Sequence, residues 1–270
     1  MSIWSYDDIA RNPSPFLKTW SCPFCRATLS QLHKNINLES PLYGCIDEDV
    51  WRETTEEMFI CQTCGWWRFE KRLEENFVEL ETLVCGAVAS LRELDLSDIS
   101  LPIQHIRDYL AAKYEKRFEI HPRLFEETVA SVFRDLGYSA QVTGYGNDGG
   151  IDVILYKNEE LIGVQVKRYK ARIEVEQLRS LAGALVLSGT TRGVFVTTSE
   201  FRSGCEKTTH GYRYVGMQIE LMNANDFYDA LGIAQRNVYR SMDDLNLNQI
   251  RECMITVEDD MDHLKDWLSK

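Results

Sequence analysis

An acidic, an amide and a basic side chain occur close together in the stretch GNDGGIDVILYKNEELIGVQVKRYK, residues 146 to 170. Asp152 opens one apolar run, and Gln165 and Lys167 lie near the end of the next. Carboxylate and amide oxygens bind hard cations such as Mg²⁺, and a lysine beside the cation can orient an attacking water or stabilise negative charge. If the fold buries these side chains together, the acid and the lysine must pair with each other, coordinate a metal or take part in catalysis.

Two adjacent strands would bring them together. Side chains alternate across a strand, so Gln165 and Lys167 share one face. On the preceding run we expect Ile151 and Val153 to share a face and Asp152 to lie opposite them, on the Gln165 side, once the apolar sets are buried together. An ordinary cross-strand ion pair between Asp152 and Lys167 is the alternative interpretation.

A third acid is expected from a helix that begins at Pro122 and ends at Gly137. Glu126 lies at the edge of its apolar stripe, whereas Glu127 falls on the solvent face. Glycines surround Asp152 and leave room for a substrate; they are Gly144, Gly146, Gly149 and Gly150. Asp148 is assigned to the same turn.

The elements that must position these residues alternate between strand and helix. Strand-like segments lie at 151–156, 161–167, 193–198 and 217–221, and helical segments at 174–187, 201–211 and 224–231. The first two strands are predicted to form a hairpin through Lys157, Asn158 and Glu159, while later strands need helical crossovers. This pattern predicts an α/β domain with a mixed sheet flanked by helices. A connecting helix is expected from Leu101.

The order FEETV, LGYSAQVTGYGNDGGIDVI, GVQVKRY and RGVFVTTSEF resembles the catalytic domain of Mrr-like restriction endonucleases. That family is a branch of the PD-(D/E)XK nuclease superfamily in which glutamine replaces the second acid of the strand. The resemblance covers residues 121–232 and implies a PD-(D/E)XK restriction-endonuclease-like core that hydrolyses DNA with a divalent metal. Residues 1–100 lie outside it.

Position by position, the resemblance implies roles for four side chains. Asp152 is the metal-binding acid, Gln165 and Lys167 are the QxK pair, and Glu126 is the helix acid. The Gln165 amide and the Val166 carbonyl would complete the protein ligands of Mg²⁺. Because Gln165 carries no charge, we expect one tightly held ion rather than two. For DNA contact we select a short basic run: Arg168, Lys170 and Arg172.

Two C-x-x-C pairs, SCPFCRA and ICQTCGWW, predict a structural zinc site with Cys22, Cys25, Cys61 and Cys64 as its ligands. Four buried free cysteines are the alternative, and Cys45 is a competing ligand. The surrounding residues, rich in Cys and Trp with short strand-like runs, indicate a small metal-stapled module. We expect Trp66 and Trp67 to fill its core rather than to stack on bases.

The expected domains are a zinc-ribbon-like domain at 1–80, a helical linker at 81–120, an Mrr-like nuclease domain at 121–232, and a C-terminal helix and acidic tail at 233–270. The net charge of −12 argues against non-specific coating of nucleic acid, so DNA contact must be local. With no leader or membrane-spanning run, and with paired rather than framework cysteines, a cytoplasmic protein without membrane contact is expected.

These observations predict a Mg²⁺-dependent endonuclease acting on DNA, with double-stranded DNA as the first candidate. The resemblance implies a role in prokaryotic restriction or anti-phage defence. The N-terminal module is expected to serve a protein partner or self-association as a homo-oligomer. Two alternatives stay open: a non-catalytic adaptor or assembly subunit built on a nuclease fold, and a nuclease that acts on RNA or branched DNA.

Overall fold

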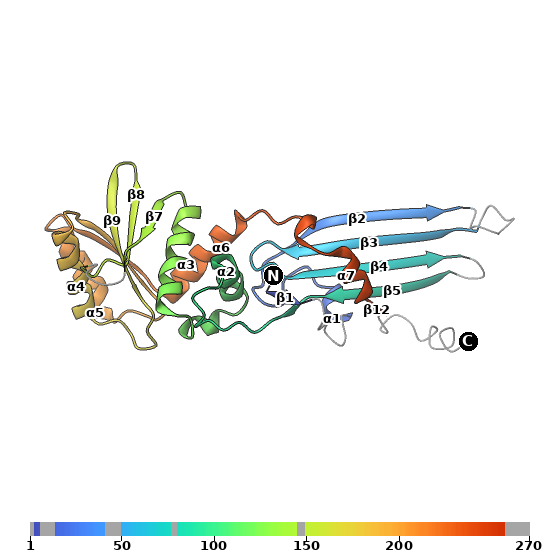
Figure 1. Ribbon diagram of the computed structural model, residues 1–270, viewed down its shortest axis with the longest axis horizontal. Helices are drawn as coiled ribbons and strands as arrows, with labels where there is room; N and C mark the ends of the chain where they lie inside the picture. The colour runs from blue at the N-terminus through green and yellow to red at the C-terminus, as the bar shows by residue number, and fades with distance from the viewer. Residues whose placement is uncertain (1–2, 6–13, 41–49, 77–79, 145–148, 257–270) are drawn as a thin grey trace. The chain divides into compact units, whose positions relative to one another are not determined.

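The computed structural model describes residues 3–5, 14–40, 50–76, 80–144 and 149–256. The chain folds into two compact units (Figure 1). The cysteine unit consists of residues 1–93 and 239–270, and the α/β unit consists of residues 94–238. These boundaries differ from the expected ones because strands and helices that follow residue 80 and residue 232 pack into the units on either side.

The cysteine unit is built on an antiparallel sheet of long strands. Its first elements are β1 (Trp4–Ser5), α1 (Ser14–Leu17), β2 (Leu29–Glu39), β3 (Arg52–Cys61), β4 (Trp67–Glu75), β5 (Glu81–Val88) and β6 (Ser90–Leu91). β2, β3 and β4 contain 11, 10 and 9 residues. The prediction of short strands in this region is therefore wrong. Much of β2 is exposed, so its polar residues hide the apolar alternation by which strands are usually recognised.

The C-terminal part of the chain returns to the cysteine unit instead of forming a separate tail domain. It contributes η2 (Met242–Asp244), α7 (Leu247–Glu252) and β12 (Ile255–Thr256), and β12 pairs with β5 to give the sheet order β12-β5-β4-β3-β2. Arg251 on α7 forms an ion pair of 2.7 Å with Glu56 on β3. Most of the acidic tail, residues 257–270, lies outside the described residues.

The α/β unit has the predicted mixed sheet. Its elements are α2 (Ile103–Ala112), η1 (Tyr114–Phe118), α3 (Pro122–Asp135), β7 (Ser139–Val142), β8 (Val153–Lys157), β9 (Glu160–Lys167), α4 (Val175–Leu187), β10 (Arg192–Thr197), α5 (Ser203–Arg213), β11 (Gln218–Met222) and α6 (Ala224–Arg236). The strand order is β11-β10-β9-β8-β7, with β7 to β9 antiparallel and β9 to β11 parallel. Only β7 lay outside the predicted strands.

Local chemistry explains the hairpin between β8 and β9. Asn158 and Glu159 both have positive φ, which a tight two-residue hairpin turn requires, and Lys157 pairs with Glu160 across it.

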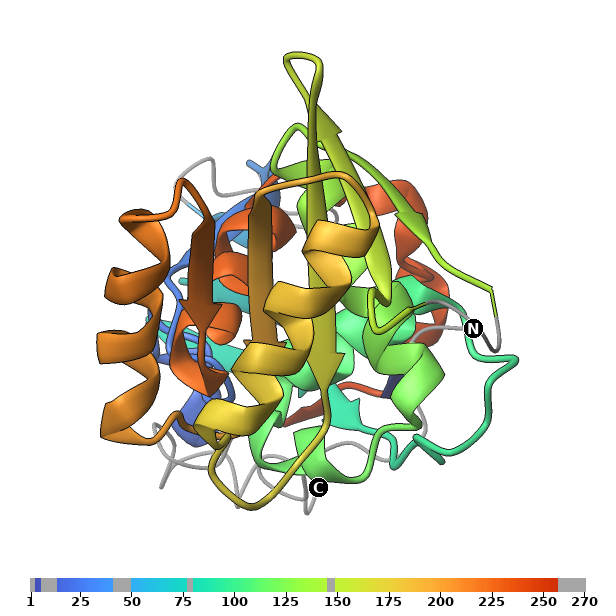
Figure 2. The same cartoon turned by 90° about the vertical axis from the view of Figure 1, so that its left-hand side faces the viewer.

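α4 lies on one side of the sheet, and α3 and α6 lie on the other (Figures 1 and 2). Glycines let α4 approach closely, because a Cβ at Gly163 would lie 2.6 Å from a methyl of Leu185.

The expected linker helix is an integral part of the α/β unit. Arg107 on α2 is buried, and its guanidinium binds the Asp135 carboxylate at 2.6 Å and the Ser131 hydroxyl at 2.9 Å, both on α3. Asp108 accepts a hydrogen bond of 2.6 Å from the Gln235 amide on α6. Buried polar groups of this kind are costly unless paired, so α2 is held to its neighbours.

No helix in the described part of the chain is long and apolar enough to cross a membrane.

Candidate active site

A glycine turn immediately before β8 sets the direction of Asp152. Gly149 and Gly150 have φ of +62° and +89°, a region that other residues rarely adopt. The predicted alternation of side chains fails at this point. Ile151 is buried in a core cluster with residues of α4, and Ile154 packs against the same cluster. Ile151 therefore lies on the Ile154 side of the sheet and does not share a face with Val153. The cause is that β8 begins only at Val153, so the strand period does not extend back through the turn.

Asp152 is buried and held from several directions. Its Oδ2 accepts a hydrogen bond of 2.6 Å from the backbone N–H of Val166 on β9. Its own N–H donates to the Val164 carbonyl at 2.8 Å, and its carbonyl accepts from the Thr143 N–H at 3.0 Å. A carboxylate that accepts a backbone N–H in a buried setting is stabilised in its charged form. Asp152 therefore presents a carboxylate in a fixed orientation at the end of the hairpin.

Gln165 presents an oxygen that fits a cation. Its Nε2 donates to the Gly150 carbonyl at 3.0 Å, which fixes the orientation of the amide. Its Oε1 is buried and has no hydrogen-bond partner among the residues that the structure describes. An unpaired buried carbonyl costs roughly 1–3 kcal/mol, so its retention needs an explanation. A hard cation bound by this oxygen would supply that explanation, because amide and carboxylate oxygens are donors that suit Mg²⁺.

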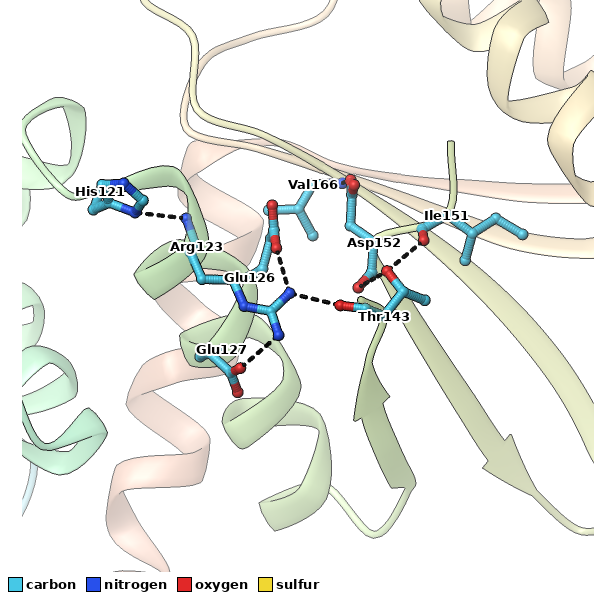
Figure 3. A network of polar contacts seen from close by, with 8 residues as sticks. All are labelled: His121, Arg123, Glu126, Glu127, Thr143, Ile151, Asp152 and Val166. Atoms are coloured by element: carbon cyan, nitrogen blue, oxygen red, sulfur yellow. Dashed lines mark hydrogen bonds and ion pairs between the residues drawn. The ribbon is translucent and has the colours of Figure 1, made fainter. Parts of the chain in front are cut away.

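Glu126 on α3 lies near Asp152 and Lys167, since the charges of both act on its carboxyl group. Burial raises the pKa of its carboxyl group, and the nearby charge of Asp152 raises it further. Arg123 and Lys167 act in the opposite direction. The Arg123 guanidinium binds Glu126 at 3.2 Å and Glu127 at 3.1 Å (Figure 3). Glu127, expected on the solvent face, is partly exposed and binds the same arginine as Glu126.

Lys167 ends β9 beside this cluster. Its carbonyl accepts hydrogen bonds from the Thr197 hydroxyl at 3.0 Å and from the Thr198 N–H at 3.2 Å, which anchor the strand end to β10 and the loop after it. Its side chain is half-buried, and its charge lowers the pKa of Glu126. The structure thus gathers the predicted residues at one end of the hairpin: Glu126, Asp152, Gln165, Val166 and Lys167.

The basic run after β9 divides into anchored and exposed residues. The Arg168 guanidinium donates to the Phe118 carbonyl at 2.6 Å, and this hydrogen bond joins the end of β9 to η1. Lys170 is exposed, with its ammonium 5.9 Å from the centre of the Phe118 ring, and Arg172 is exposed as well. Sequence reasoning missed Arg117, whose guanidinium lies 4.1 Å above the same ring. Arg117 is next to Phe118 in the sequence, but no local pattern places this pair beside a basic run that follows 50 residues later.

Four cysteines converge in the cysteine unit as predicted. The Sγ atoms of Cys22, Cys25, Cys61 and Cys64 all lie within 4.8 Å of one another. Hydrogen bonds from the other three thiols lower the pKa of Cys61, whereas burial raises that of Cys64. Four soft ligands at this separation fit one tetrahedral zinc ion. The competing ligand Cys45 and the turn residue Asp148 lie outside the described residues.

The two cysteine knuckles have the same backbone geometry. In each, the N–H of the first cysteine donates to the carbonyl five residues later: Cys22 to Ala27 at 2.8 Å, and Cys61 to Trp66 at 2.7 Å. In each, the residue after the second cysteine has positive φ, 65° at Arg26 and 83° at Gly65. This repeated turn explains how pairs far apart in the chain offer equivalent thiols.

The paired tryptophans belong to the core, as expected. Trp66 and Trp67 are each 1% exposed, and the Trp66 indole N–H donates to the Ala89 carbonyl at 2.9 Å. Neither ring is available to stack on a base. Trp20 is different, being 67% exposed at the edge of the Phe59 ring.

A mixed sheet between helical layers, with acid, amide and lysine side chains at the end of a β-hairpin, defines an α/β core of the PD-(D/E)XK nuclease type. Residues 118–231 match the Mrr catalytic-domain family, whose description is restriction endonuclease. This segment is an Mrr-like restriction endonuclease domain. It ends within α6 and includes every residue of the predicted catalytic set.

The chain is also similar in sequence to a restriction enzyme. The type IV methyl-directed restriction enzyme EcoKMrr of Escherichia coli (strain K12) is 34% identical over 110 residues. The matched region is 37% of this chain and 36% of that enzyme, so the chain spans about a third of the relative's length.

Proposed function

We propose that this protein is a Mg²⁺-dependent endonuclease that cuts DNA in prokaryotic restriction or anti-phage defence, in the cytoplasm. The observation that carries the proposal is the Gln165 amide: its Oε1 is buried without a hydrogen-bond partner among the described residues, and its Nε2 is fixed on the Gly150 carbonyl, two residues before the buried Asp152. A purely structural hairpin gains nothing from an unpaired buried carbonyl. Membership of residues 118–231 in a restriction endonuclease family supports the same reaction.

In this proposal each residue has one task. Asp152, the Gln165 amide oxygen and the Val166 carbonyl would hold one Mg²⁺, and a bound Mg²⁺ would supply neutralisation of charge on the scissile phosphate and a more acidic attacking water. Glu126 contributes directly or through a water. The Lys167 ammonium orients the water or stabilises the negative charge that develops in the transition state. Lys170 and Arg172, with Arg168 behind them, contact the phosphate backbone locally.

The cysteine unit supplies structure and assembly in the proposal. Cys22, Cys25, Cys61 and Cys64 would hold one Zn²⁺ with all four of its tetrahedral positions filled by protein, so the ion would be structural. With its strands rich in acids, this unit suits a protein partner or a second copy of the chain better than a DNA backbone. Self-association would provide the two active sites that a double-strand break requires.

The proposal is tested by incubating the full chain with supercoiled plasmid at graded Mg²⁺. Asp152→Ala and Lys167→Ala should fold and fail to nick, and Gln218→Glu on the edge strand β11 serves as a surface control. Parallel reactions with methylated plasmid, RNA, single strands and branched DNA identify the substrate class. Undiminished nicking by either active-site variant refutes the residue assignment.

A wild-type protein that cuts none of these substrates would favour the adaptor alternative. Cleavage of RNA or junctions in preference to duplex DNA would keep the catalysis and change the substrate. These outcomes are distinguishable because the metal-binding residues can be examined separately, by calorimetric titration with Mn²⁺ in the absence of nucleic acid.

A further inference from the structure

Arg123 lies at the centre of a set of contacts that joins the helix acid to the strand acid (Figure 3). Its Nη1 binds Glu126 at 3.2 Å and donates to the Thr143 carbonyl at 2.7 Å. Within the described part of the chain, Arg123 provides the ion pair that Glu126 makes. The position of Glu126 therefore depends on Arg123.

Thr143 carries the connection onward to Asp152. It follows β7, and its hydroxyl lies 2.8 Å from the Ile151 carbonyl and 3.0 Å from the Asp152 carbonyl. Its N–H also donates to the Asp152 carbonyl at 3.0 Å. A single residue thus receives the guanidinium on one side and holds the backbone of the glycine turn on the other.

We propose that Arg123 is a positioning residue: through Thr143 it sets the separation of Glu126 from Asp152, and hence the geometry of the cleavage step. This inference rests on the proposed function. The contacts define a continuous strut, Glu126 to Arg123 to Thr143 to Asp152, that joins α3 to the start of β8. The fork of the guanidinium is needed, because a lysine ammonium offers one compact charge in place of a planar set of donors.

The strut acts on Glu126 and leaves Asp152 and Gln165 in place. The Asp152 carboxylate is oriented by the Val166 N–H, and the Gln165 amide by the Gly150 carbonyl. Neither contact involves Arg123. Breaking the strut should therefore spare cation binding and slow the reaction, whereas a general loss of folding would reduce both.

The experiment compares Arg123→Lys, Thr143→Val, Thr143→Ser and the double variant Arg123→Lys/Thr143→Val with the wild type. Mn²⁺ affinity is measured by calorimetry without DNA, and plasmid nicking at saturating Mg²⁺. We expect Arg123→Lys to nick about 10- to 100-fold more slowly, as displacement of a reacting group by an ångström would cause. Its Mn²⁺ affinity should stay within about threefold of the wild type.

Thr143→Val removes the hydroxyl contacts to the Ile151 and Asp152 carbonyls and keeps the backbone contacts, so it should show the same split with a smaller loss of rate than Arg123→Lys. Thr143→Ser, which keeps the hydroxyl, should restore nicking to within about threefold of the wild type. The double variant should be no more than about threefold slower than its slower parent, because both changes break one strut. Glu127→Gln is the matched control, since Glu127 contacts the same guanidinium but does not lead to Asp152.

The assignment fails if Arg123→Lys nicks at the wild-type rate, if Thr143→Ser is as slow as Thr143→Val, or if the two defects multiply. Should Arg123→Lys be unfolded by circular dichroism, the Thr143 pair decides. A wild type that neither binds Mn²⁺ nor nicks DNA refutes the proposed function and this inference with it. Wild-type nicking with unaffected Arg123 and Thr143 variants refutes the strut alone.

Discussion

Exchanging Gln165 for glutamate should make the α/β unit less stable without Mg²⁺ and more responsive to it. The amide Nε2 lies 3.0 Å from the Gly150 carbonyl, and a carboxylate oxygen in its place has no proton to donate. The variant loses that hydrogen bond and places a carboxylate oxygen against the Gly150 carbonyl oxygen. The free energy of unfolding falls by roughly 1–3 kcal/mol as a result. Gln165 is 4% exposed and Asp152 8% exposed, so the additional buried charge costs at least about as much again.

We therefore expect the free energy of unfolding in Mg²⁺-free buffer to fall by about 2–5 kcal/mol. For a unit of this size the melting temperature would drop by about 5–15 °C. The same charge attracts a divalent cation. Unit charges 4 Å apart interact by about 4 kcal/mol at an effective dielectric constant of 20, so Mg²⁺ should bind at least about tenfold more tightly.

The assay is thermal unfolding followed by far-ultraviolet circular dichroism over a Mg²⁺ series. None of the six tryptophans in the sequence falls at positions 94–238, so tryptophan fluorescence does not report on the α/β unit and should not change. Gln218→Glu makes the same chemical change at an exposed position and should leave both signals unaltered. The reasoning is refuted if Gln165→Glu melts with the wild type in Mg²⁺-free buffer, or if Mg²⁺ stabilises the two proteins equally.

Two further predictions concern the cysteine cluster and Glu126. Cys61→Ser, or zinc removal with a strong chelator, should lower the melting temperature reported by tryptophan fluorescence and release about one Zn²⁺ per chain in a colorimetric assay; absence of zinc together with an unchanged melt would contradict this. The raised pKa of Glu126 means that the folded state holds this proton more tightly than the unfolded state. The resulting stability is present at low pH and is lost as pH rises through the folded pKa, so Glu126→Gln should gain melting temperature relative to the wild type between roughly pH 4 and pH 7. A difference that is constant over that range would rule out the assignment.

Features set by neighbouring residues could be predicted from the sequence. The turn at Asn158 and Glu159 joins two apolar runs, and these pair as the antiparallel strands β8 and β9 of the predicted hairpin. Strand alternation correctly places Gln165 on the face of Gly163, because the period of two holds within β9. The C-x-x-C knuckles are equally local, since each closes its own turn by backbone hydrogen bonds. Short-range geometry is enough for such features.

Features that join distant residues were decided by the tertiary structure. β12 covers the edge of β5 from the far end of the chain, and Arg168 donates to a carbonyl 50 residues before it. Ile151 leaves the strand alternation because the glycine turn redirects the chain toward α4. Arg123 and Thr143 are unremarkable in the sequence; their contacts exist only because α3 packs against β7. Pairing across such separations depends on how whole elements pack, which the local periodicity of a sequence does not encode.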